Sequence, residues 1–168
     1  MEKKIITIVA IVFFGLFGLM VWGQSAQKNL AAEKKIETGG KSMLSVVGAS
    51  GYDFGTISMK NGKVRYRFKV ANSTNKDVML KSVVTSCMCT SAYILGGAEK
   101  KGPFSMSGMG YVPPADELIK AGESREVEVE FDPNAHGPSG VGTIARVITL
   151  TDENEGVIEF NFKAEVTP

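Results

Sequence analysis

The sequence predicts an all-β domain, a sandwich of two antiparallel sheets, that follows one N-terminal transmembrane helix. Beyond Ser42, apolar and polar residues alternate with a period of two, which is typical of half-buried strands. Gly, Pro, Asn and Asp residues separate the alternating stretches, and no convincing amphipathic helix interrupts them. Near the N-terminus, residues 5–22 form an apolar run without a charged residue.

The apolar run at residues 5–22 predicts a membrane anchor. As a helix it measures about 27 Å, close to the thickness of the hydrocarbon layer. Lys3 and Lys4 precede it, which favours a cytoplasmic segment at residues 1–4 and a domain outside the cytoplasm, in the periplasm or at the cell surface. The alternative is a cleaved signal peptide, with Gly23-Gln24-Ser25 as the processing site; the length of the run favours an uncleaved single-pass anchor.

The residues after the anchor divide into a polar linker, residues 23–42, and a folded domain, residues 43–168. Basic residues cluster before Ser42, so the domain is slightly acidic although the whole chain has a formal net charge of +1. Nucleic-acid binding requires a basic surface, and the domain sequence shows none. The sequence contains no feature that indicates a small-molecule substrate.

The alternating stretches predict about seven strands in order. Two short edge strands are expected at residues 43–47 and 52–57, followed by longer strands at residues 63–70, 77–86, 124–131, 141–151 and 156–166. Residues 63–70 alternate apolar side chains with Lys and Arg, whereas residues 124–131 alternate them with Glu. If these two strands are antiparallel neighbours, their outward charges form cross-strand ion pairs. The alternative is two solvated faces that never meet.

Residues 96–118 interrupt this rhythm and predict a long loop rich in Gly and Pro. A long loop inside a compact domain is usually functional or disordered. Its large apolar side chains favour a loop that packs on the end of the sandwich or on a protein partner. The candidate contact residues are Phe104, Met106, Met109 and Tyr111. An exposed sheet edge that accepts a partner strand is a second candidate surface.

Cys87 and Cys89 are the only cysteines, in the run Ser86-Cys87-Met88-Cys89-Thr90. In a strand their Cα atoms would lie about 6.6 Å apart, near the upper limit for an unstrained disulfide. A structural role, as buried thiols or a strained disulfide at a strand end, is the first reading. A redox-active dithiol is the second, although no residue nearby in sequence supplies a clear cation to lower a thiol pKa.

Metal binding is the third reading of the cysteine pair. Thiolate and thioether ligands suit Cu(I), and His136 is the only histidine. The candidate Cu(I) ligands are Cys87, Cys89, Met106, Met109 and His136. Otherwise we expect no cofactor. The sequence has no Gly-x-Ser-x-Gly elbow, no phosphate-binding loop and no zinc-ligand spacing, and it therefore predicts no enzyme.

Several motifs resemble the bacterial DUF1573 domain over roughly residues 43–166. They are, in the order of that family, Tyr52-Asp53-Phe54-Gly55-Thr56-Ile57, a strand that ends at Asn72, Ser86-Cys87-Met88-Cys89-Thr90, Ala121-Gly122-Glu123-Ser124 and Val129-Glu130-Phe131-Asp132-Pro133. The resemblance implies an immunoglobulin-like sandwich, related to Hydin/ASPM-type modules, that is exported or membrane-tethered and has no established activity. Met88 stands where Gly is common, Ala121 where Pro is usual, and the loop at 96–118 is longer than typical.

Together these observations predict a membrane-anchored, extracytoplasmic, immunoglobulin-like module that binds a protein partner and has no catalytic activity. The alternative is a thiol-redox or Cu(I)-handling protein that uses Cys87-Met88-Cys89.

Overall fold

The computed structural model describes residues 40–168. The predicted anchor, residues 5–22, and the linker up to residue 39 lie outside the described residues. Within residues 40–168, no helix is both long and apolar enough to cross a membrane. The last linker residues belong to the fold, because the backbone of Gly40–Lys41 pairs with the C-terminal strand. The predicted boundary at residue 42 was therefore a few residues too late.

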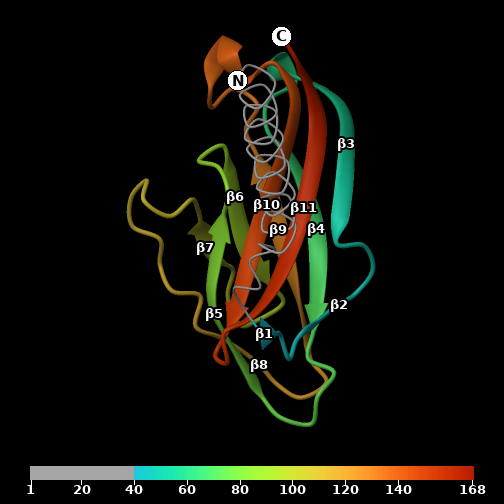
Figure 1. Ribbon diagram of the computed structural model, residues 1–168, viewed down its shortest axis with the longest axis vertical. Coiled ribbons are helices and arrows are strands. Elements are labelled where there is room, and N and C mark those ends of the chain that lie inside the picture. Colours follow the sequence, from blue (N-terminus) through green and yellow to red (C-terminus); the bar gives the residue numbers. More distant parts are fainter. Residues whose placement is uncertain (1–39) are drawn as a thin grey trace, which may run out of the picture. The chain divides into compact units, whose positions relative to one another are not determined.

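The described residues form two sheets (Figure 1). In the first sheet, β11 (Gly156–Thr167) pairs with β10 on one side and with β1 and β3 on the other. Its remaining strands are β1 (Gly40–Lys41), β3 (Gly51–Ser58), β10 (Gly142–Asp152), β5 (Val78–Thr85) and β8 (Glu117–Ile119). The second sheet has the order β2 (Ser45–Val46), β4 (Val64–Ala71), β9 (Ser124–Phe131), β6 (Thr90–Leu95) and β7 (Lys101–Phe104). Two short 3-10 turns, η1 (Met59–Asn61) and η2 (Gly137–Gly140), complete the described elements.

The all-β fold and all seven expected strands are present, but the sheets are not wholly antiparallel. Both β1 and β3 run parallel to β11. The chain passes from β1 in the first sheet to β2 in the second and returns to the first as β3. Because β2 lies between them in the chain, β1 and β3 reach the same edge of β11 in the same direction. The alternation of apolar and polar residues does not show in which order the chain passes between the two sheets, so the sequence could not predict these parallel pairings.

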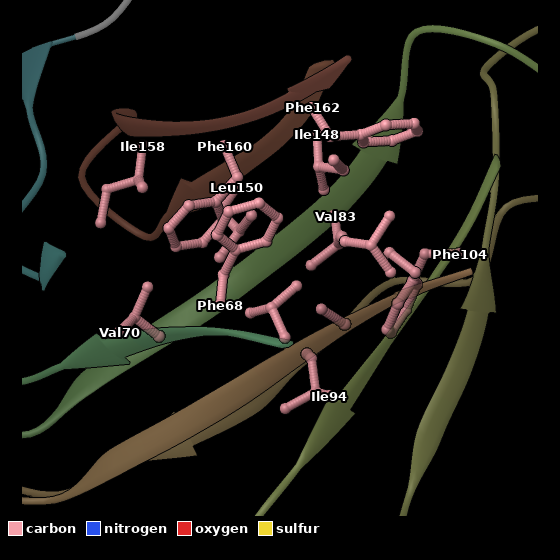
Figure 2. Close-up of a cluster of buried hydrophobic side chains, with 14 of the residues drawn as sticks. Phe68, Val70, Val83, Ile94, Phe104, Ile148, Leu150, Ile158, Phe160 and Phe162 are labelled. Atoms are coloured by element: carbon pink, nitrogen blue, oxygen red, sulfur yellow. The ribbon is translucent and has the colours of Figure 1, made fainter. Parts of the chain in front are cut away.

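The core lies between the two sheets, as Figure 2 shows. The second sheet contributes Phe68 and Ile94, among others, and the first contributes Ile148 and Phe160. The rings of Phe68 and Phe160 stack across the interface with their centroids 4.5 Å apart. The C-terminal strand β11 directs every second side chain into this core, namely Ile158, Phe160, Phe162, Ala164 and Val166.

The predicted loop at residues 96–118 contains two strands that sequence reasoning missed. β7 has four residues and includes Gly102 and Pro103, and β8 has only three residues. Strands this short and this rich in Gly and Pro show no alternating pattern. Phe104, the last residue of β7, is 1 % exposed and belongs to the core. The expectation that Phe104 contacts a partner was therefore wrong.

The expected pairing of the basic and acidic strands is confirmed. β4 and β9 are antiparallel neighbours, with Arg65 opposite Glu130 and Arg67 opposite Glu128. Lys63 Nζ lies 2.8 Å from Glu130 Oε1, and Arg67 Nε lies 3.0 Å from Glu128 Oε2. The sequence misjudged their exposure, because both glutamates are buried beneath the cationic side chains. β9 is the central strand of the second sheet, so side chains from both neighbours cover its outer face.

These ion pairs predict a loss of stability in acid. The hydrogen bond from Lys63 lowers the pKa of Glu130, burial opposes this effect, and Arg65 lowers the pKa further. Lys100 and Arg67 lower the pKa of Glu128 in the same way, against the effect of burial. A carboxylate whose pKa is lower in the folded state stabilises the fold fully above its unfolded pKa of 4.5. That stabilisation is lost as the pH falls below this value toward the folded pKa.

We therefore expect the free energy of unfolding in urea to be level from about pH 7 to about pH 5.5 and to decline below it. The double substitution Glu128→Gln/Glu130→Gln removes the two carboxylates, so its curve should decline less steeply than that of the wild type. Urea titrations at pH 7, 5, 4 and 3 check both statements. Parallel curves for the two proteins would show that these glutamates do not cause the acid sensitivity.

Candidate functional site: the Cys87–Cys89 disulfide

Cys87 and Cys89 form a disulfide in the turn that leads from β5 in the first sheet to β6 in the second. Their Cα atoms lie 5.2 Å apart, closer than the spacing of a strand allows. The backbone N–H of Thr90 donates to the carbonyl of Cys87 at 3.1 Å, which closes a tight turn around Met88. The cysteines therefore lie just beyond the end of a strand, and the spacing calculated for two residues within a strand does not apply to them.

Hydrogen bonds to both sheets hold this turn in place. The buried hydroxyl of Thr85 lies 3.0 Å from the carbonyl oxygen of Cys87 and 3.1 Å from that of Thr90. The backbone N–H of Ser86 donates to the carbonyl of Val147 in β10. The backbone N–H of Asp132, just after β9, donates to the carbonyl of Cys89 at 2.9 Å. The position of the disulfide is thus fixed at one end of the sandwich.

His136 faces the first sulfur of the pair. It lies in the turn between β9 and η2, and its Nε2 is 3.2 Å from Cys87 Sγ. The backbone N–H of Cys89 also donates to Cys87 Sγ, at 3.3 Å. Cys87 therefore has two nitrogen neighbours, one from its own turn and one from a segment far along the chain.

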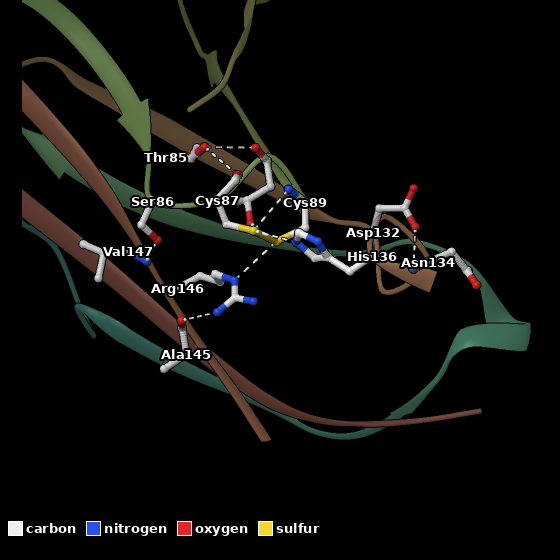
Figure 3. The surroundings of a disulfide bond; sticks show 11 residues. Thr85, Ser86, Cys87, Cys89, Asp132, Asn134, His136, Ala145, Arg146 and Val147 are labelled. Carbon is white, nitrogen blue, oxygen red and sulfur yellow. Dashed lines mark hydrogen bonds between the residues drawn. A yellow bond between two sulfur atoms is a disulfide. The ribbon is translucent and has the colours of Figure 1, made fainter. Parts of the chain in front are cut away.

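Arg146 of β10 faces the second sulfur, and its Nε donates to Cys89 Sγ at 3.3 Å. Its Nη1 also donates to the carbonyl of Ala145 at 2.8 Å, which holds the guanidinium in place. Figure 3 shows Arg146 and His136 directed at the disulfide from two different segments. No residue close to the cysteines in the sequence supplies a clear cation, which argued against redox chemistry. The structure supplies that cation from a residue 57 positions away.

A signal for Arg146 exists in the sequence. In β10 the inward residues are Ile144, Ile148 and Leu150, all of them buried. Alternation places Arg146 in the same row, so a charged residue occupies a position that faces inward. Charged residues are rare at such positions unless they have a partner, and here the partner is a sulfur atom.

Three of the five candidate copper ligands lie together. The ligand atoms of Cys87, Cys89 and His136 lie within 4.8 Å of one another. Met106 forms a backbone bridge with Thr85, and Met109 is 59 % exposed in the segment after β7. The thiolate is the form of cysteine that binds metals, so this group cannot serve as a thiolate site while the disulfide is intact.

The remaining contact candidates lie in the segment between β7 and β8, residues 105–116, which we call the 105–116 segment. Figure 1 shows it extending away from both sheets. Met106 is partly buried near the start of the segment. Tyr111 is 84 % exposed, and it and Met109 are the most exposed large apolar residues of residues 40–168.

The sheet edges offer less to a partner strand than the sequence suggested. The edge strand β7 contains Pro103, which has no N–H to donate. The edge strand β3 has an irregular register opposite residues 163–165, and Gly55 there has a φ of +65°. The edge strands β2 and β8 have only two and three residues. Short edges, bulges and proline are features that block edge-to-edge pairing.

Comparisons with known proteins support the family resemblance and the fold. The family described as "Protein of unknown function (DUF1573)" matches residues 46–102, a range that includes the cysteine pair. A protein of unknown function from Porphyromonas gingivalis W83 is 17 % identical with a TM-score of 0.52; the match covers 79 % of this chain and 50 % of that one. A family 123 glycoside hydrolase from Clostridium perfringens is 12 % identical with a TM-score of 0.51, with coverages of 71 % and 23 %.

The chain thus spans half or less of the length of these two structures, and at such low identity they show a common fold alone. No curated protein matches the chain.

Proposed function

We propose that this chain is a membrane-anchored, extracytoplasmic, immunoglobulin-like module without catalytic activity, and that its 105–116 segment binds a protein partner. The apolar run at residues 5–22 supports the anchor. The disulfide supports a location outside the cytoplasm, because disulfides persist in oxidising compartments.

The observation that carries the proposal is an exposed apolar tip on a fixed base. Tyr111 and Met109 leave most of their surface in water, with a larger exposed fraction than any other large apolar residue of residues 40–168. Tyrosine and methionine are enriched in the buried centres of protein interfaces. Burial of these two side chains against a partner would therefore contribute favourable free energy that the isolated domain does not obtain.

The base of the segment is held by polar contacts at both ends. At its start, the backbone N–H of Thr85 donates to the carbonyl of Ser105. At its end, Lys101 Nζ donates to the carbonyls of Ala115 and Asp116 at 3.2 and 2.7 Å. The backbone N–H of Ala115 also donates to the carbonyl of Lys81 in β5 at 2.8 Å. Fixed ends reduce the ordering entropy that the segment must lose on binding.

Site-specific photocrosslinking tests this proposal. A photoreactive phenylalanine analogue replaces Tyr111 in the full-length chain, expressed in its native cells. The matched control carries the same analogue at Tyr52, a partly exposed tyrosine of β3 that stacks on Tyr66. We expect a discrete covalent adduct from position 111, none from position 52, and loss of the adduct when Met109→Ser is added. Equal labelling from both positions, or no adduct from position 111, would contradict the proposal.

A further inference from the structure

We infer that the Cys87–Cys89 disulfide is redox-active and accepts two electrons from the dithiol of a partner protein. This goes beyond the proposed binding function, which needs no reaction at the cysteines. The inference rests on the groups that surround each sulfur, because those groups determine how well each sulfur can be attacked and how well it can leave as a thiolate.

Cys87 is the more exposed residue of the pair. Cys87 is 8 % exposed and Cys89 is 3 % exposed, and the intervening Met88 is exposed at the surface of the turn. An attacking thiolate must approach a disulfide sulfur directly. The partner therefore attacks Cys87 Sγ, and Cys89 is the leaving group.

The leaving sulfur already has a cation beside it. Arg146 Nε donates to Cys89 Sγ at 3.3 Å, and the Thr90 hydroxyl lies 3.7 Å from the same sulfur. When the disulfide opens, the negative charge appears on Cys89 Sγ, where a fixed guanidinium N–H already points. A neighbouring cation stabilises a thiolate and hence the reduced form. A disulfide with a stabilised reduced form is a stronger oxidant than a purely structural one.

Cys87 Sγ also has neighbours that can stabilise a negative charge, which it needs when it leaves the mixed disulfide as a thiolate. Cys87 Sγ receives the backbone N–H of Cys89 at 3.3 Å and lies 3.2 Å from His136 Nε2. A hydrogen bond to a thiolate stabilises it as a leaving group in the same way. Each sulfur thus has an N–H donor 3.3 Å away that can stabilise a negative charge on it.

The two steps balance as thiol–disulfide exchange. In the first step, a partner thiolate forms a bond to Cys87 Sγ, the Cys87–Cys89 bond breaks, and its electron pair remains on Cys89. In the second step, the other thiolate of the partner attacks the partner sulfur of the mixed disulfide and releases Cys87 as a thiolate. The partner ends as a disulfide, having lost two electrons, and the two thiolates of this chain become a dithiol by taking up the two protons that the partner's thiols released.

A metal site is less well supported by the same geometry. Cys87, Cys89 and His136 lie close enough to share an ion after reduction. However, the guanidinium of Arg146 contacts one of the ligand sulfurs and places a positive charge beside the position that the ion would occupy. The cation favours a free thiolate over a metal-bound one.

The reduction potential of the full-length protein in detergent tests the inference. The protein is equilibrated with glutathione at a series of reduced-to-oxidised ratios, then alkylated, and the fraction of reduced cysteine pairs is measured by mass. We expect the equilibrium constant for reduction to fall about tenfold in Arg146→Gln, which corresponds to about 30 mV for a two-electron couple. Arg67→Gln, which removes an arginine from the ion pairs of the second sheet, is the matched control and should not change the constant.

An unchanged constant in a folded Arg146→Gln protein would overturn the inference, and so would a wild-type disulfide that stays oxidised at every glutathione ratio. A second measurement does not depend on Arg146→Gln folding. Cys89→Ser leaves Cys87 as the single thiol, and Cys87→Ser leaves Cys89. At a pH above the ordinary thiol pKa of about 8.5 both single thiols are thiolates, so their rates report access to each sulfur. We expect Cys89→Ser to form a mixed disulfide with oxidised glutathione there at least several times faster than Cys87→Ser. Equal rates, or a faster reaction at Cys89, would contradict the assigned direction of attack.

Discussion

Replacing Asp152 with alanine is expected to lower the free energy of unfolding by about 3 to 5 kcal/mol. Asp152 ends β10 and is almost completely buried. Its Oδ2 accepts from the Ser42 hydroxyl at 2.7 Å and from the Met43 N–H at 3.0 Å, and its Oδ1 accepts from the N–H groups of Asn154 and Gly156, both at 2.9 Å. Alanine would leave the buried N–H of Gly156 and the part-buried N–H of Met43 without an acceptor.

Asp152→Asn tests how much of the stability depends on the charge and hydrogen bonds of the carboxylate, because it changes these while keeping the shape of the side chain. The amide has nearly the same volume, but one acceptor becomes a donor that faces other donors. We expect most of the loss to remain. Glu159→Gln, an exposed substitution on β11 with the same change of charge, is the control and should stay within about 0.5 kcal/mol of the wild type. Urea unfolding at pH 7 measures the wild type and the three variants, Asp152→Ala, Asp152→Asn and Glu159→Gln. Equal stability of Asp152→Asn and the wild type would show that the hydrogen bonds to this carboxylate contribute little.

Phe160→Ala is expected to lower the free energy of unfolding by a similar amount, about 3 to 5 kcal/mol. Phe160 has no exposed surface, and its ring stacks on that of Phe68 across the two sheets. Alanine removes the ring and leaves a cavity between sheets that cannot both relax to fill it.

Tyr111→Ala provides the contrast for Phe160→Ala, because it also removes an aromatic ring but from a side chain that is 84 % exposed. We expect its effect on stability to stay within about 0.5 kcal/mol, since little buried surface is lost. Thermal or urea unfolding of both variants measures the difference. Comparable losses at the two positions would mean that the 105–116 segment packs on the domain and is not a free contact surface.

The fold was predictable where the sequence repeats a pattern over many residues. The basic stripe of residues 63–70 and the acidic stripe of residues 124–131 predicted, as one of two alternatives, that these strands are antiparallel neighbours, because opposite charges on facing strands attract each other. The inward set of β11 followed from its alternation. By contrast, β7 and β8 are too short to show a period, and the parallel pairing of β3 depends on how the chain crosses between sheets.

The candidate site was predictable only in part. The cysteine pair is evident because the sequence has only two cysteines, separated by one residue. His136 was proposed as a Cu(I) ligand because it is the only histidine. The position of Arg146 in the inward row of β10 was a signal, but its partner was not predictable, because Cys89 is distant in sequence and the contact appears only when β10 and the β5–β6 turn come together. The strand spacing assumed for the cysteines failed because a turn shortens the distance between them. Contacts between distant segments depend on the topology, which local patterns do not encode.

The placement of β1 determines where mechanical force enters the domain. Any pull transmitted through the chain before Gly40 reaches the fold first at the two residue pairs that join β1 to β11. Immediately behind them, the Ser42 and Met43 contacts with Asp152 fasten the chain to the β10–β11 hairpin. A force applied to the N-terminal end of the domain therefore acts first on these backbone and side-chain hydrogen bonds. It reaches the aromatic core only after they have broken.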